Sequence, residues 1–67
     1  MKQFFCLRLQ HEDFSRDDLR IYFRASLYRA RRVYDSLAYV LPASPYESIW
    51  LELASGEVLL YTKERRS

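Results

Sequence analysis

The chain has one cysteine, one glycine, one histidine and two prolines among its 67 residues, and it has no long apolar run. A single cysteine excludes an internal disulfide and a cysteine-based zinc site. No segment approaches the roughly 20 apolar residues of a membrane-spanning helix. Arg8 and Gln10 interrupt the apolar N-terminus, which therefore does not match a signal peptide. We expect a cytoplasmic protein that binds no metal or cofactor and does not enter a membrane.

What remains is the composition of a small folded domain. Hydrophobic residues make up 49% of the chain, aromatic residues 16% and charged residues 30%, a balance that disordered segments do not have. A chain this short buries little of its surface and lies near the lower limit for folding alone. We therefore expect one domain over residues 1–67, stabilised by packing and helped by oligomerisation.

The positive charge is concentrated in the centre of the chain. The net charge is +2, and residues 15–41 hold six arginines against three aspartates, which gives +3 there and −1 elsewhere. Arginine favours planar contacts with carboxylates, phosphates or aromatic rings.

Local patterns predict a β-α-β-β order. Residues 2–10 alternate between apolar and mixed positions, which is typical of a strand. Ser15 and Asp18 have the spacing of a capping box, and no helix-breaking residue follows until Pro42. We therefore expect one long helix over about 15–41. An apolar stripe along it would face a core. Its members are Leu19, Phe23, Ser26, Ala30, Tyr34, Leu37 and Leu41.

The single glycine predicts a β-hairpin over about 47–63. Ser55-Gly56 separates two apolar runs, which is a strong hairpin signal. A two-residue turn pairs Leu53 with Val58 on one face. It also places Trp50 opposite Tyr61 and Glu52 opposite Leu59 on the other face, and a shift of one residue would exchange the faces.

These elements predict an α+β fold, in which one long helix packs on a three-stranded, mainly antiparallel sheet. We prefer the strand order 1-3-2, because antiparallel sheets tolerate one open face. The alternative makes the first two strands parallel neighbours joined by a right-handed crossover.

One helix cannot cover both faces of this sheet. The second face carries Phe4, Trp50, Leu59 and Tyr61, and an exposed apolar patch of that size marks an interaction surface. We expect it to form a homodimer, sheet against sheet. The alternatives are a cover formed by residues 42–46, a platform for stacking bases and another protein partner.

The predicted helix supplies a second candidate surface. Tyrosine and arginine are enriched at protein interfaces, and we select six residues of these types outside its apolar stripe as the candidate surface. They are Arg20, Arg24, Tyr28, Arg31, Arg32 and Tyr39. They predict a protein partner with an acidic surface. Nucleic acid is the second choice, because a pI of 8.9 is modest for a domain that binds phosphates.

No catalytic site is predicted. His11-Glu12-Asp13 is the one titratable cluster, and neighbouring residues of a connector point in different directions, so a nuclease using His11 ranks third. The size and element order resemble those of very small regulatory proteins, including phage-encoded inhibitors of host enzymes and some anti-CRISPR proteins, without a shared motif. We predict a non-enzymatic module that binds and inhibits or modulates a larger protein. The alternative is a small RNA- or DNA-binding regulator.

Overall fold

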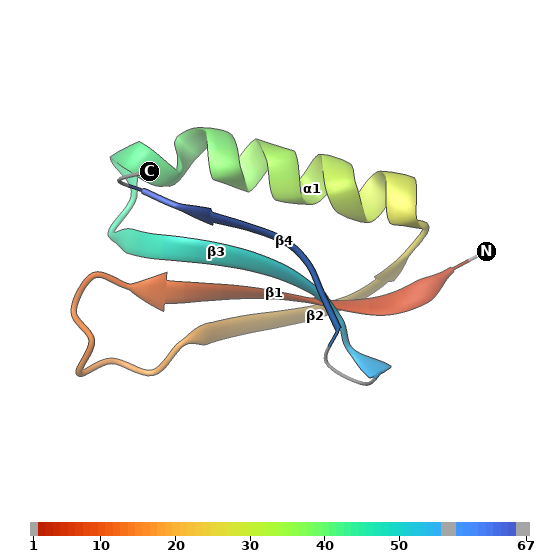
Figure 1. Cartoon of the computed structure of the whole chain (residues 1–67), viewed down its shortest axis with the longest axis horizontal. Helices are drawn as coiled ribbons and strands as arrows, with labels where there is room; N and C mark the ends of the chain where they lie inside the picture. The colour runs from red at the N-terminus through yellow and green to blue at the C-terminus, as the bar shows by residue number, and fades with distance from the viewer. Residues whose placement is uncertain (1, 56–57, 66–67) are drawn as a thin grey trace.

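The computed structural model describes residues 2–55 and 58–65. Its elements are β1 (Gln3–His11), β2 (Leu19–Ala25), α1 (Leu27–Val40), a 3-10 turn η1 (Leu41–Ala43), β3 (Tyr46–Leu53) and β4 (Val58–Glu64). The strands form one antiparallel sheet in the order β2-β1-β3-β4, and α1 crosses one face of it (Figure 1). The α+β class and the mainly antiparallel sheet are confirmed.

The predicted long helix is wrong in its first half. Residues 19–25 form β2, which pairs with β1 without a break from Leu9↔Leu19 to Gln3↔Ala25. The segment Leu-Arg-Ile-Tyr-Phe-Arg-Ala alternates in side-chain character, a period that also suits a strand. The sheet therefore has four strands instead of three. β1 and β3 are antiparallel neighbours, and the order 1-3-2 is not observed.

The helix begins at Leu27 because Ser26 caps it. Ser26 is extended at the N-cap position, and its Oγ accepts a hydrogen bond from Arg29 N at 3.2 Å. Ser15, the predicted cap, instead donates from Oγ to Asp13 Oδ1 in the β1–β2 connection. Pro42 lies in the 3-10 turn that follows Val40, so the predicted stop at this proline is close to the observed end.

The hairpin of β3 and β4 starts in the predicted register and then shifts. Leu53 pairs with Val58 and Glu52 with Leu59, as expected, but an irregularity between Leu51 and Glu52 makes Tyr61 the partner of Leu51. Such a β-bulge moves the following residues of one strand to the opposite face. Gly56 lies outside the described residues.

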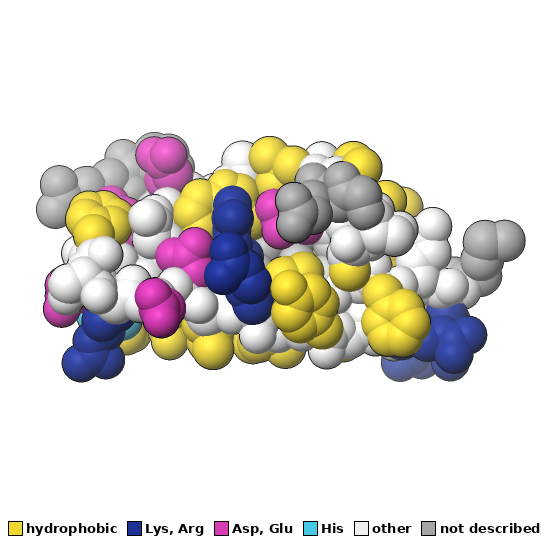
Figure 2. Space-filling view, turned by 90° about the horizontal axis from the view of Figure 1, so that it is seen from below, with side chains coloured by type: hydrophobic (Ala, Val, Ile, Leu, Met, Phe, Trp, Pro, Cys, Tyr) yellow, Lys and Arg dark blue, Asp and Glu magenta, His cyan; other side chains and the backbone are white. Residues whose placement is uncertain are grey.

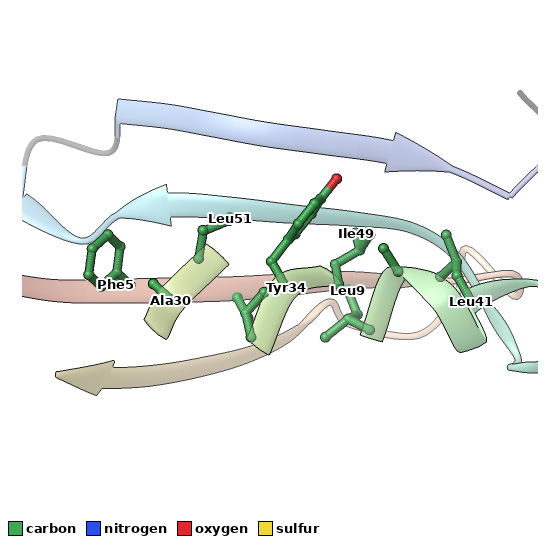
Figure 3. Close-up of a cluster of buried hydrophobic side chains, with 9 residues drawn as sticks. Phe5, Leu9, Ala30, Tyr34, Leu41, Ile49 and Leu51 are labelled. Atoms are coloured by element: carbon green, nitrogen blue, oxygen red, sulfur yellow. The ribbon is translucent and has the colours of Figure 1, made fainter. Parts of the chain in front are cut away.

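The core lies between α1 and the two central strands. Small side chains at Ala30 and Ala38 let the helix approach the sheet. Figure 3 shows Ala30 and Tyr34 on the same side of α1, facing the strands. Below them the strands contribute large apolar side chains that are almost fully buried. These are Phe5, Leu7, Leu9, Ile49 and Leu51, with Leu41 closing one end. The core therefore uses every second residue of β1 and of β3, which lie on one face of the sheet.

Candidate functional site

The six predicted partner-binding residues do not form one surface. Arg20 and Arg24 lie on β2 opposite Arg8 and Phe4, and therefore on the sheet face away from α1. The other four lie on α1. These are Tyr28, Arg31, Arg32 and Tyr39. The sheet separates the two groups.

Arg31 and Arg32 of α1 are engaged within the protein. Arg31 donates from Nε to Asp35 Oδ1 at 3.0 Å, and its Cζ lies 4.2 Å from the centroid of the Tyr61 ring. The hydrogen bond to Asp35 is the main reason that the pKa of Arg31 is raised. Arg32 donates to the Tyr28 hydroxyl at 3.2 Å. A partner that took these arginines would have to replace existing contacts.

The face of the sheet away from α1 is uncovered and mixed in character. Figure 2 looks onto it and shows hydrophobic side chains beside a central column of basic atoms with acidic atoms close by. One row runs across all four strands as Tyr22, Cys6, Glu52 and Leu59. The next row is Arg20, Arg8, Trp50 and Thr62. We call this surface the open face; it also carries Phe4 and Arg24.

Arg8 lies at the centre of the open face. Its Cζ is 4.5 Å from the centroid of the Trp50 ring, and it has Glu52 Oε2 at 3.7 Å and Asp18 Oδ2 at 3.9 Å. Its Nε is buried and has no hydrogen-bond partner within the described chain. Two carboxylates and one ring thus surround this guanidinium, which lies against the indole.

Three of the four residues predicted for the second apolar face do share the open face. Phe4 is 60% exposed and Leu59 is 50% exposed, whereas Trp50 is partly covered. Tyr61 is not with them: the bulge directs it toward α1, where its ring centroid is 5.6 Å from that of Tyr34. The expected four-residue surface is therefore corrected to three.

The open face also holds an aromatic side chain that the sequence prediction missed. Tyr22 is 64% exposed and lies opposite Cys6, whose own side chain is buried. It lines a hollow together with Cys6, Arg8, Arg20, Glu52, Leu53 and Ala54. Arg20, Tyr22 and Arg24 alternate with apolar residues, and this strand-like pattern could have predicted that Tyr22 shares a sheet face with the two arginines.

The His11-Glu12-Asp13 cluster organises a connection between strands. His11 Nδ1 accepts from Asp13 N at 2.9 Å, and Asp13 Oδ1 accepts from both Ser15 Oγ and Ser15 N. The hydrogen bond from the Ser15 side chain is the main reason that the pKa of Asp13 is lowered. Glu12 pairs with Arg65 at 3.0 Å. His11 and Asp13 thus bond within the β1–β2 connection, and Glu12 contacts Arg65, which follows β4.

Across residues 2–55 and 58–65, no group of three or more histidine, cysteine, aspartate or glutamate side chains is placed to hold a metal ion. In the same ranges, no helix has the length and apolar character needed to cross a membrane. Comparison with models of known protein families gives no match, and neither do comparisons with curated proteins and with solved structures.

Proposed function

We propose that this protein is a non-enzymatic module that binds a larger protein and modulates it by occupying part of its surface, and that the open face makes the contact. The observation that supports this most is the exposure of Phe4, Tyr22 and Leu59 on one sheet face around a fixed Arg8–Trp50 pair. Exposed apolar side chains gathered on one face mark interaction surfaces.

The centre of this surface is organised before any partner arrives. Trp50 is held by Arg8, and Arg8 is held by Asp18 and Glu52. Side chains that are already ordered lose less conformational entropy on binding. Tryptophan and arginine are also the residue types that dominate the energetics of protein interfaces. The Arg8–Trp50 pair is therefore suited to be the anchor, with Phe4 and Leu59 beside it.

The charges on the open face favour an apolar protein surface as the partner, in place of the acidic surface expected from the sequence. Arg8, Arg20 and Arg24 are balanced there by Asp18, Glu52 and Glu64. Binding to nucleic acid derives most of its affinity from uncompensated cations that replace counterions on phosphates. Arg8 also lies over the Trp50 ring, where a stacked base would sit. We therefore propose a protein ligand and make nucleic acid an outcome of the test.

The test compares two matched pairs of exposed substitutions. Phe4→Ser with Leu59→Ser alters the open face, and Val33→Ser with Tyr39→Ser alters exposed positions of α1. Proteins captured by the tagged wild type are quantified for both variants, and a captured partner is then purified and titrated, with Trp50 emission as the readout.

The open-face variant should weaken binding by more than about tenfold, the range of interface hot spots, while the helix variant binds as the wild type does. If instead the helix variant lost binding and the open-face variant kept it, the binding site would lie on α1. Tight binding of a single-stranded oligonucleotide that falls steeply and log-linearly with salt would replace the protein proposal with the nucleic-acid alternative.

A further inference from the structure

The two edges of the sheet differ in a way that points to a second copy of the chain. β4 is interrupted by the bulge opposite Leu51 and Glu52, and bulges blunt an edge against pairing. β2 pairs with β1 over seven unbroken positions and contains no proline or lysine. Its outer edge carries main-chain groups that no strand of the described chain pairs. Arg20 and Arg24 are the charged residues of this strand, but without a bulge or a proline the edge remains a template for another strand.

The helix side of β2 is apolar as well as unpaired. Leu19 and Ile21 are 43% and 41% exposed there, and Phe23 stacks on Phe5 with ring centroids 5.8 Å apart. Water contacts a row of apolar side chains next to unpaired backbone. A second strand laid antiparallel along this edge would satisfy the backbone and cover the row together.

Symmetry restricts the registers of such a pair. When a two-fold axis runs perpendicular to the sheet, both copies present the same face, so a residue at the centre lies opposite itself. Centring on Arg20 places two arginines face to face. Centring on Tyr22 places Arg20 opposite Arg24 of the second copy, twice. Like charges directly opposite are destabilising.

Centring on Ile21 removes these clashes and creates complementary pairs. On the helix side, Leu19 lies opposite Phe23 of the second copy. On the open face, Arg20 lies opposite Tyr22, and Arg24 lies opposite Asp18, which precedes β2. No ion pair is seen for Arg24 among the residues that the structure describes. The two-fold axis makes each of these pairs twice.

We propose that the protein forms a homodimer in which β2 pairs antiparallel with β2 of a second copy, centred on Ile21, to give one continuous eight-stranded sheet. Two open faces then lie side by side on the same surface. The dimer uses the backbone edge and the Asp18–Arg24 pairs, and the partner contact proposed above uses Phe4, Trp50 and Leu59. Because Asp18 also lies 3.9 Å from Arg8, the variants that leave Asp18 unchanged, Arg24→Asp and Ile21→Cys for the dimer and Phe4→Ser with Leu59→Ser for the partner contact, distinguish failure of one proposal from failure of the other.

The charge pairs give a test that depends on the register. Alone, Asp18→Lys places two cations opposite each other and Arg24→Asp places two anions, so each variant should dimerise about tenfold more weakly than wild type. An equimolar mixture restores an opposite-charge pair at both positions and should form a heterodimer. Analytical ultracentrifugation is the measurement, with a wild-type mass of twice the 8.1 kDa of one chain expected. Urea titrations of both variants verify that they fold.

Cross-linking provides an independent check of the register. In a Cys6→Ser background, Ile21→Cys places two thiols opposite each other, and we expect rapid disulfide formation. Phe23→Cys places its two thiols about 13 Å apart along the strands, at about 3.3 Å per residue, beyond disulfide reach. A wild-type monomer at high concentration would overturn the proposal. The proposal would also be overturned if neither charge variant changed the dimerisation constant while Phe4→Ser with Leu59→Ser dissociated the dimer. That result would mean that the two sheets pack face to face.

Discussion

Arg8 on β1 and Trp50 on β3 are direct cross-strand partners, and the guanidinium of Arg8 lies over the indole with its Cζ 4.5 Å from the ring centroid. Contacts of this kind are worth about 0.5–1 kcal/mol at exposed sites and more where water is excluded. Trp50 is the only tryptophan of the chain. Its fluorescence therefore reports on this pair alone.

The first prediction concerns that fluorescence. Removing the guanidinium with Arg8→Ala should shift Trp50 emission to longer wavelength and increase its quenching by acrylamide, because water replaces the arginine over the ring. Arg20→Ala is the matched control, since Arg20 lies in the same row but on the far side of β1 from Trp50. An unchanged quenching constant in Arg8→Ala would mean that the guanidinium does not shield the ring in solution.

The second prediction locates the helix N-terminus. Ser26→Ala removes the oxygen that accepts from Arg29 N, and it should lower the free energy of unfolding by about 1 kcal/mol. Ser15→Ala changes a serine in the exposed β1–β2 connection and should alter it by less than about 0.5 kcal/mol, as surface substitutions do. Both values come from urea denaturation. The opposite ranking would restore the helix that begins at Ser15.

The third prediction tests the bulge in β4. Tyr61 packs against Tyr34 and beneath Arg31, so Tyr61→Ala should destabilise the protein by about 2 kcal/mol, somewhat less than a fully buried ring would. Thr62→Ala, at the next position and on the open face, should cost less than about 0.5 kcal/mol. If Thr62 were the costly site, the hairpin would continue in its initial register through residue 62.

The fourth prediction is a pH dependence. Burial raises the pKa of the Tyr34 hydroxyl, so the folded state keeps this proton at a pH where the unfolded state releases it. The free energy of unfolding should therefore be insensitive to this group below pH about 10, the ordinary value for tyrosine, and should fall as the pH rises further. Tyr34→Phe should reduce that fall. Tyr39→Phe, which removes an exposed hydroxyl, should follow the wild type; identical curves for all three proteins would contradict the prediction.

The sequence was sufficient to predict those elements in which one periodicity of apolar side chains, or one local turn signal, dominated. The strand over 3–11, the stop near Pro42 and the first two pairs of the hairpin were predictable, because alternation, proline and a glycine-containing turn act locally. The apolar pattern of residues 19–25 fits both the period of a helix and the period of a strand. Leu19 and Phe23 fit a helical stripe, while Arg20, Tyr22 and Arg24 alternate with apolar neighbours.

Tertiary pairing decided between those periods. β1 has a second edge, and β2 satisfies its hydrogen bonds there, an energy that no local propensity contains. The same limit applies to the candidate site. The open face was predicted from β1 and β3, but Tyr22 joined it and Tyr61 left it. A one-residue bulge inside a run of apolar residues leaves no trace in the alternation, because either phase looks equally apolar.

For the β2–β2 dimer proposed above, the bulge in β4 also sets how many copies can join. A sheet with two edges that can pair accepts one further copy at each edge, and repeated pairing would extend it into a fibre. Here the irregularity near Leu51 and Glu52 leaves β2 as the usable edge. Growth through a single edge terminates after one addition. A one-residue insertion in a strand far from β2 thus makes the difference between a closed pair and open-ended polymerisation.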